Sequence, residues 1–376
     1  MTAVVERLAG ARTLVGELVG DRADAWDLAG ELPLAVLREL GGLGALCAQV
    51  PPEYGGLGLS SLDNGELTAH TGSLCSSVRS VQTSQGMAAW TIARLGTAEQ
   101  RRACLTELTS GGLAAMAFSE PDAGSDLSAI ETRIEPDGDE VVVTGRKVWV
   151  TAAAYADLIV VVGRFGPDAA VVVVPATAPG VHVERVPDPV GCRAAGHADV
   201  RLDSVRLPAG AVLGGGGQAL SMVVTTALTY GRMSVAWGCV GILRACLRES
   251  TAHARSRSQF GRPLAEHQLV ARRLAELLVA ERVATTTCEH ASGCWDSGDP
   301  DLAVQAVLAK HVSSGNAARG AASAVQMLAS RAAQDGTPVA RAYRDAKLME
   351  IIEGTTEICQ IVLAQHAMAT AGRNHG

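Results

Sequence analysis

The sequence predicts a three-part fold: an N-terminal all-α domain, a middle β-barrel domain and a C-terminal four-helix bundle. Three observations favour it. Leu and Ala recur at helical spacing in the first third, short valine-rich runs fill the middle third, and long Ala/Leu/Val stretches follow. A chain of 376 residues exceeds what one hydrophobic core usually organises. We therefore expect domains at residues 1–114, 115–215 and 216–376.

The N-terminal region is predicted to be helical with one prominent loop. Its helical spacing is clearest at Leu32, Leu34, Leu37 and Leu40. The turn-rich run Pro-Pro-Glu-Tyr-Gly-Gly at 51–56 interrupts this pattern. Thr97, followed three residues later by Gln100, forms a capping box, which predicts a helix from there to about Leu108.

The middle region contains short valine-rich segments separated by Gly, Pro and Asp, which is typical of a small antiparallel sheet or barrel. The predicted strands cover 141–143, 147–150, 158–162, 170–174 and 181–186. Four glycines at 214–217 then predict a loop or hinge. The periodic stretches beyond them predict helices at about 218–255, 265–295, 301–333 and 345–370.

Composition excludes several classes of protein. The net charge of -7, the absence of a long basic run and only three Phe, four Tyr and five Trp argue against a nucleic-acid partner. The valine-rich runs are too short to span a membrane, and Glu6, Arg7 and Arg12 interrupt any signal-peptide-like stretch. Nine cysteines form no Cys-x-x-Cys pair and no Cys/His ligand spacing, which predicts reduced thiols, no metal site and a cytoplasmic protein.

Two segments carry the chemistry. Residues 117–126 read Ala-Phe-Ser-Glu-Pro-Asp-Ala-Gly-Ser-Asp, and residues 345–357 read Asp-Ala-Lys-Leu-Met-Glu-Ile-Ile-Glu-Gly-Thr-Thr-Glu. Alone, the first is an ordinary turn and Glu353 an ordinary helix-end carboxylate. Together they resemble the two signature segments of the acyl-CoA dehydrogenases, whose order of helices, sheet and helices matches the whole chain. The resemblance implies an acyl-CoA dehydrogenase-like fold, FAD as the cofactor and Glu353 as the catalytic base.

The same resemblance implies which residues hold the flavin. Ser119 would bond the ring near its reactive nitrogen, with Phe118 packed nearby and Gly124 and Ser125 at the pyrophosphate. Residues 145–151, Gly-Arg-Lys-Val-Trp-Val-Thr, resemble the family strand whose Trp and Thr contact the flavin, here Trp149 and Thr151. Taken alone, Trp149 is more typical of a plain barrel core. Ala152 stands where the family usually has Asn, so one polar contact is expected to be missing.

A further set of residues resembles the part of the family site that reaches the adenine half of a neighbouring subunit's cofactor. If these residues act in that way, the protein is a homodimer or homotetramer. The family pattern Gln-x-x-Gly-Gly-x-Gly reads Gln-Met-Leu-Ala-Ser-Arg-Ala at 326–332, so only its Gln is carried over. Two residues just after the base, Thr355 and Glu357, match cofactor contacts. The adenine-side set is Arg257, Phe260, Gln268 and Gln326.

Three residues are predicted to contact the substrate. Arg79 falls where the family helix faces the acyl end, with Thr83 one turn further, and an Arg there could bind a carboxylate or an oxygenated acyl group. A solvated helix face is the alternative for Arg79. Arg232 matches an Arg that often contacts coenzyme A, with an interhelical ion pair as its alternative. Gly354, beside the base, completes this set.

A closer resemblance narrows the acyl group. Four segments resemble acyl-CoA dehydrogenase homologues of polyketide (antibiotic) clusters that make the methoxymalonyl extender unit: 72–77, 84–90, 191–199 and 234–244. It implies a three-carbon hydroxyacyl thioester on an acyl carrier protein and a 2-hydroxymalonyl product. The C3 aldehyde would enter as its hydrate, lose a hydroxyl proton to Glu353 and give hydride to the flavin.

Other functions remain open from the sequence alone. They are α,β-desaturation of a short-chain CoA thioester, formation of the aminomalonyl analogue from a seryl thioester, a flavin oxidase or monooxygenase, and a cofactor-free scaffold that docks a carrier protein. The electron acceptor is not indicated. An acidic carrier protein could dock at Arg101–Arg102, or at Arg272–Arg273 with Arg282, although solvated helix faces are the more usual explanation of such arginines.

Overall fold

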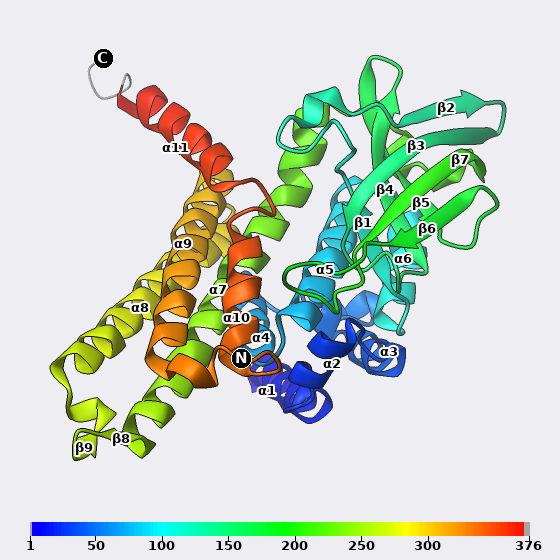
Figure 1. Ribbon diagram of the computed structural model, residues 1–376. Helices are drawn as coiled ribbons and strands as arrows, with labels where there is room; N and C mark the ends of the chain where they lie inside the picture. Colours follow the sequence, from blue (N-terminus) through cyan, green and yellow to red (C-terminus); the bar gives the residue numbers. More distant parts are fainter. Residues whose placement is uncertain (1, 372–376) are drawn as a thin grey trace.

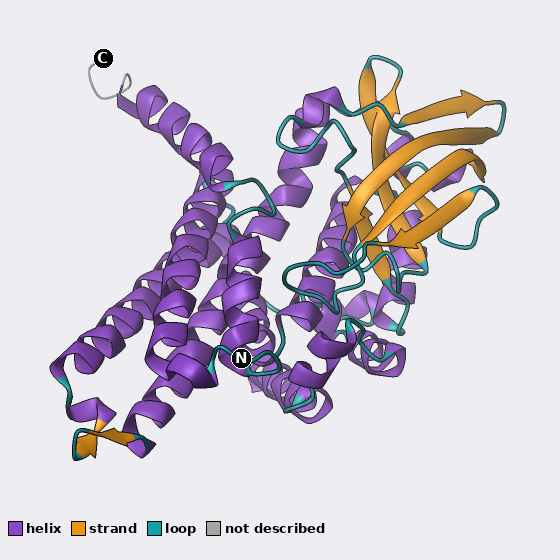
Figure 2. Cartoon of the chain, in the orientation of Figure 1, coloured by secondary structure: helices purple, strands orange, loops and turns teal. Residues whose placement is uncertain are grey.

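The computed structural model describes residues 2–371 and arranges them as helices, a curled sheet and a second set of helices (Figures 1 and 2). The predicted three-part fold is therefore confirmed. The N-terminal helices are α1 (Thr2–Val19), α2 (Ala23–Ala29), α3 (Leu34–Gly42), α4 (Ser61–Leu74), α5 (Ser76–Leu95) and α6 (Ala98–Thr109).

Helix α6 begins at the predicted capping box. The Thr97 hydroxyl accepts a hydrogen bond from the Gln100 backbone N–H, and the Gln100 side chain accepts one from the Thr97 N–H. The Gln100 amide nitrogen also donates to the carbonyls of Gly210 and Val212. Gln100 thus takes part in the cap of α6 and also joins this helix to the segment that follows the sheet.

The middle sheet has its strands in the order β1-β4-β2-β3-β7-β6, with β5 also paired to β4. A single residue pair, Arg133 with Arg164, joins β2 to β4, so the sheet curls at this point. The predicted strands at 141–143 and 147–150 form one strand, and β1, β2 and β7 were not predicted. The strands are β1 (Ala114–Ala117), β2 (Arg133–Asp137), β3 (Glu140–Val150), β4 (Leu158–Phe165), β5 (Asp168–Pro175), β6 (Val181–Arg185) and β7 (Ala198–Pro208).

The C-terminal bundle is built around α7 (Leu220–Ser256), which packs against α8 (Gln268–Ser297), α9 (Leu302–Leu328) and α10 (Pro338–Met349). This confirms the predicted four-helix bundle. The single helix predicted at 345–370 is wrong, because the helix is interrupted at residues 350–355 and a separate helix, α11 (Thr356–Ala371), follows. Glu353 and Gly354 have φ angles of 56° and 96°, which a right-handed helix does not allow.

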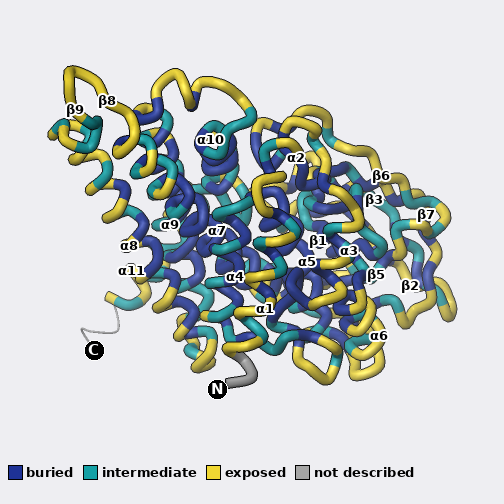
Figure 3. The backbone as a smooth tube through the Cα atoms, turned by 90° about the horizontal axis from the view of Figure 1, so that it is seen from below, coloured by how far each residue is buried: buried dark blue, intermediate teal, exposed yellow. Residues whose placement is uncertain are grey.

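Burial is greatest where α4, α5 and α7 meet in the middle of the molecule (Figure 3). The small hairpin of β8 (Ser258–Gln259) and β9 (Arg262–Pro263) lies exposed at one end. All nine cysteines are free thiols, and eight of them are buried. Within residues 2–371, no helix has both the length and the apolar character needed to cross a bilayer.

Candidate functional site

A strained turn between α10 and α11 presents Glu353. A left-handed conformation at a non-glycine residue costs roughly 1–2 kcal/mol, and Glu353 and Gly354 adopt it in succession. The carboxylate lies over Gly231 of α7: a Cβ at that glycine would stand 2.4 Å from Glu353 Oε2 and 2.7 Å from Met87 Sδ. The missing side chain at Gly231 therefore provides the space that the carboxylate occupies.

The Glu353 carboxylate has the electrostatics of a general base. Its Oε2 is buried and has no hydrogen-bond partner among residues 2–371. Burial raises the pKa of Glu353 to about 7, while the charges of Arg232, Lys310 and Arg79 act in the opposite direction. A base with a pKa near neutrality has the proton affinity that general-base catalysis requires.

Two cations contact the backbone of this turn. Arg232 Nε donates to the carbonyl of Glu353 at 3.1 Å. Lys310 Nζ donates to the carbonyls of Gly354 at 2.6 Å and Glu350 at 3.4 Å. These bonds fix the turn and leave the carboxylate itself free.

Arg79 is buried in the core and not on a solvated helix face, since its exposed fraction is 1%. Its Nη1 donates to Thr83 Oγ1 at 3.1 Å, its Nη2 lies 3.0 Å from Met349 Sδ, and its Nε has no partner. Thr83 Oγ1 in turn lies 2.7 Å from Ser234 Oγ. In the described part of the chain no carboxylate lies within ion-pair distance of Arg79, so its charge is uncompensated.

Glu353 and Arg79 face each other across two helices. Arg79, Thr83 and Met87 follow one face of α5 at four-residue intervals. On α7 the facing positions are Gly231 beside Met87, Ser234 beside Thr83, and Gly238, where a Cβ would lie 2.7 Å from Arg79 Cδ. Gly231 and Gly238 stand about 10 Å apart along α7 at 1.5 Å per residue. From its place beside Gly238 the Arg79 guanidinium extends back to Thr83. The Thr83 layer is next to the layer of Met87 and Gly231, where the Glu353 carboxylate lies.

The predicted flavin segments meet at the end of the sheet beside α5. The carbonyl of Ser119 accepts from the Val148 N–H at 2.9 Å, and Lys147 Nζ donates to the Phe118 carbonyl at 2.9 Å. The buried Glu120 carboxylate pairs with Lys147 at 2.6 Å. Strand β3 therefore holds the Phe118–Ser119 segment in place.

This end of the sheet has the open space and the polar groups that a flavin needs. Trp149 is 54% exposed with a φ of 55°, and a Cβ at the exposed Gly124, next to the exposed Ser125, would meet no atom within 4 Å. Thr151 Oγ1 lies 3.2 Å from Nδ1 of His197. Burial lowers the pKa of His197 to about 4, so its imidazole is neutral at physiological pH.

The remaining predicted cofactor residues form a second group. Arg257 and Gln326 line one pocket, together with Ala329 and Ser330, between the ends of α7, α8 and α9. Phe260, at the tip of the β8–β9 hairpin, is 95% exposed, and Gln268 is the first residue of α8. Figures 1 and 3 show this hairpin and the sheet at opposite ends of the molecule. The structure therefore does not bring this group to Trp149.

The last two predicted contacts, Thr355 and Glu357, lie just after Glu353. Thr355 Oγ1 accepts from the Ile358 N–H at 3.4 Å at the start of α11, and the Glu357 side chain is exposed. They adjoin the strained turn, on the same side of the molecule as Glu353.

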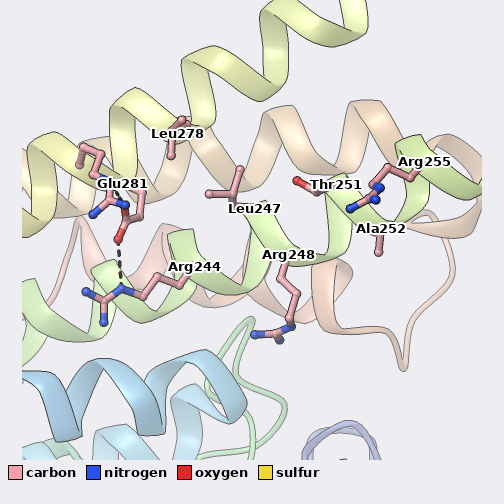
Figure 4. A pocket seen from close by; sticks show the side chains of 9 residues that line it. Arg244, Leu247, Arg248, Thr251, Ala252, Arg255, Leu278 and Glu281 are labelled. Atoms are coloured by element: carbon pink, nitrogen blue, oxygen red, sulfur yellow. Dashed lines mark hydrogen bonds and ion pairs between the residues drawn. The ribbon is translucent and has the colours of Figure 1, made fainter. Parts of the chain in front are cut away.

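The predicted arginine patches have different surroundings, and Arg273 lines the same pocket as Arg257 and Gln326. Arg282 lines a groove between α7 and α8 with Arg244, Arg248 and Arg255 (Figure 4). Glu281 bonds Arg244 at 3.0 Å and lies 3.5 Å from Arg282, so part of the positive charge is compensated. No group of three metal-ligating side chains occurs within residues 2–371.

Sequence reasoning missed Ser234, His197 and Lys310. Lys310 offered a signal, because it is the one charged side chain between Leu302 and Ala318 in an otherwise apolar or neutral stretch. Such a lysine on a bundle helix either reaches the surface or has a buried polar task. Ser234 and His197 offered no comparable signal, because their partners come from distant segments.

Comparisons with known proteins identify related sequences and structures. The sequence matches three family profiles: the acyl-CoA dehydrogenase N-terminal domain at residues 6–112, the middle domain at 115–205 and the C-terminal domain at 221–368. A probable acyl-CoA dehydrogenase of Bacillus subtilis, YngJ, is 32% identical over 358 residues, covering 93% of this chain and 94% of its own.

Two solved structures are similar along nearly their full length. FkbI, for biosynthesis of the methoxymalonyl extender unit of the polyketide immunosuppressant FK520, is 61% identical with a TM-score of 0.91, covering 95% of this chain and 99% of its own. A Mycobacterium smegmatis glutaryl-CoA dehydrogenase in complex with FADH2 is 25% identical with a TM-score of 0.91, covering 97% and 94%.

Proposed function

Because this chain belongs to the acyl-CoA dehydrogenase family and is an FAD-dependent oxidoreductase, we propose that it oxidises a three-carbon hydroxyacyl thioester on an acyl carrier protein. The substrate is the 2-hydroxymalonyl-semialdehyde and the product the 2-hydroxymalonyl thioester, used for methoxymalonyl extender units in polyketide biosynthesis. The 61% identity to FkbI supports this choice of pathway.

The observation that carries the proposal is the uncompensated charge of Arg79. A hydrocarbon acyl group beside it would leave a buried cation unpaired, which is strongly unfavourable. A carboxylate or a hydrated aldehyde would instead accept bidentate, charge-assisted hydrogen bonds from its guanidinium. Arg79, Thr83 and Ser234 together offer oxygen-binding groups one helical layer from Glu353. That spacing suits a short oxygenated acyl group.

Glu353 supplies the proton chemistry. The hydrate of the C3 aldehyde loses one hydroxyl proton to the Glu353 carboxylate, and the C3–H bond breaks with its electron pair, which leaves a carboxylic acid at C3. FAD, when bound, supplies the acceptor for that hydride. Arg79 favours the product because it gains a carboxylate partner. Arg232 and Gly354 adjoin the base and are assigned to the thioester side.

The cofactor would be shared between subunits of a homo-oligomer, a dimer or tetramer. Phe118, Ser119, Gly124, Ser125, Trp149 and Thr151 would hold the ring and pyrophosphate, with Thr355 and Glu357 beside the base. Arg257, Phe260, Gln268 and Gln326 would hold the adenine half of a partner's cofactor. Their place at the opposite end of the molecule from the sheet supports sharing, since one FAD bound within a single chain could not serve both groups.

The test is anaerobic absorbance of the purified holoenzyme. The carrier-bound semialdehyde should bleach the flavin, and butyryl-CoA and a seryl thioester on the same carrier should not. Bleaching by butyryl-CoA alone would assign α,β-desaturation, and bleaching by the seryl thioester alone would assign the aminomalonyl reaction. Glu353→Gln should retain the flavin spectrum and lose substrate-dependent bleaching, whereas rapid bleaching in that variant would remove Glu353 from the role of base.

A further inference from the structure

Lys310 lies in the middle of α9 with an exposed fraction of 0%. Among residues 2–371 no carboxylate oxygen lies within 4.0 Å of its ammonium group. A buried ammonium without a counterion must find other acceptors. Its acceptors are the backbone carbonyls of Gly354, at 2.6 Å, and Glu350, at 3.4 Å.

These two carbonyls lie on either side of Glu353. Glu350 is the C-terminal cap of α10, where the unpaired carbonyls and the helix dipole favour a cation. Its carbonyl also accepts from the Thr356 N–H at 3.0 Å, which closes the turn. Arg232 takes the carbonyl of Glu353 itself. Arg232 from α7 and Lys310 from α9 therefore bind the carbonyls of residues 350, 353 and 354.

The turn depends on such external bonds. Glu353 adopts a φ of 56°, and a non-glycine residue stays in this region only when its surroundings enforce it. Glu353 Oε2 is buried without a hydrogen-bond partner among the described residues, so no hydrogen bond to this oxygen fixes the direction of the carboxylate. The aim of the carboxylate is consequently set by the backbone, and the backbone is held by Lys310 and Arg232.

We infer that Lys310 is a positioning residue for the base: its ammonium group grips the carbonyls on both sides of Glu353 and fixes the turn that aims the carboxylate over Gly231. This inference rests on the proposed role of Glu353. Three cations face that carboxylate, Arg79 from α5, Arg232 from α7 and Lys310 from α9, and each favours its ionised form. Lys310 favours the ionised form without contacting the carboxylate. It therefore stabilises the base and leaves both carboxylate oxygens without a bond to its ammonium group.

Amide hydrogen exchange of the holoenzyme tests the structural part without any substrate. Lys310→Met should increase exchange in residues 350–359 by about tenfold and leave α6 unchanged. Lys347→Met is the matched control, because Lys347 also bonds Glu350. This bond lies on the surface and joins Lys347 Nζ to the side-chain carboxylate of Glu350 at 2.9 Å, not to its backbone carbonyl. Equal exchange in Lys310→Met and Lys347→Met would overturn the inference.

The pH profile of kcat with the carrier-bound semialdehyde tests the catalytic part. Lys310→Met should lower kcat by about 100-fold with little change in KM, because a misaimed base loses most of its effect. The acid limb should move up by about half a pH unit, since losing a cation raises the pKa of Glu353. Lys347→Met should keep both values, and an unchanged kcat and acid limb in Lys310→Met would overturn the inference.

Two further variants separate the possible failures. If Lys310→Met does not fold, Lys310→Arg decides: it keeps the charge and the acid limb but should lower kcat severalfold, because a guanidinium cannot match both carbonyls in the same way. A Lys310→Arg enzyme with wild-type kcat would contradict the inference. A fully active Glu353→Gln enzyme would instead refute the proposed function. An inactive Glu353→Gln enzyme alongside an unaffected Lys310→Met enzyme would refute only the role of Lys310.

Discussion

The ionised Glu353 carboxylate destabilises the folded protein. Its pKa is about 7 in the fold and 4.5 in the unfolded reference. Below about pH 4.5 Glu353 is protonated in both the folded and the unfolded state, and the folded protein keeps its full stability. As the pH rises through about 7 the buried carboxyl group ionises, and this part of the stability is lost. At 1.36 kcal/mol per pKa unit the loss is at most about 3 kcal/mol.

Glu353→Gln should therefore raise the free energy of unfolding at pH 8.5 and leave it nearly unchanged at pH 5, because the amide stays neutral. Denaturant unfolding at the two pH values measures this difference. Glu53→Gln, at an exposed glutamate, is the control and should show no pH-dependent gain. An equal effect of Glu353→Gln at both pH values would contradict the electrostatic explanation.

Replacing Arg79 with an apolar residue should increase the stability of the protein and decrease its activity. Arg79→Met removes an unpaired buried cation and keeps an unbranched apolar side chain, so the free energy of unfolding should rise by about 1–3 kcal/mol. The same change should lower kcat/KM for the carrier-bound semialdehyde by about 100-fold or more, because the acyl oxygens lose their partner. Arg79→Lys keeps the charge without the planar fork and should fall between the two. Unimpaired turnover by Arg79→Met would show that Arg79 does not bind the acyl group.

At the scale of the helices, the closeness of α7 to the catalytic turn makes Gly231 sensitive. Gly231→Ala would place a Cβ 2.4 Å from Glu353 Oε2, so the carboxylate must move. We expect kcat to fall by about 100-fold while FAD stays bound. Gly293→Ala, on α8 with nothing within 4 Å of the new Cβ, should keep its activity and gain about 1 kcal/mol of stability. Full activity of Gly231→Ala would show that the carboxylate works from another position.

The elements that the sequence predicted well are those with a strong local signal. Thr97 and Gln100 determined the start of α6 by themselves, and the valine runs identified β4 and β5, which are buried along almost their whole length. Strand β2 reads Arg-Ile-Glu-Pro-Asp and is mostly exposed, so it has no apolar pattern to detect. In β7 the alternation slips at Ser204, where φ is 51°.

The break between α10 and α11 had a local signal that the prediction did not use: Gly354, with a φ of 96°, and Thr355, whose hydroxyl accepts from the Ile358 N–H at the start of α11. Ile351 and Ile352 continue the apolar periodicity of α10, so the pattern runs on through Glu353. Bonds from Lys310 and Arg232, which come from other helices, contact the carbonyls of the broken turn. For the same reason the resemblance to a family identified Glu353 as the base, whereas composition and spacing identified neither its turn nor the cations around it.

At the scale of the whole molecule, the two separate groups of cofactor residues predict complementation between inactive variants. Arg257→Ala should lose FAD affinity and Glu353→Gln should lose turnover. A mixed dimer would combine the intact Glu353 of one subunit with the intact Arg257 of the other, and so would contain one complete site. Random pairing of equal amounts should restore activity in about a quarter of the sites.

Co-expression of the two variants with different affinity tags, followed by purification through both tags, measures this directly. Tandem-purified Arg257→Ala with Glu353→Gln should reduce its flavin with the carrier-bound semialdehyde, and each variant alone should not. A mixed oligomer without activity would show that each chain binds its FAD alone.

The burial of eight of the nine cysteines determines how readily the thiols of this protein oxidise in air. Eight thiols lie in the interior, and burial raises the pKa of Cys47, Cys239, Cys246 and Cys288 to about 12. Oxidants and alkylating reagents attack the thiolate, which is scarce at such sites. Cys104, the partly exposed thiol on α6, is therefore the place where a maleimide dye or a first oxidative lesion should appear. Resistance to oxidation is in this way a property of the packing, and the folded enzyme should keep it without added reductant.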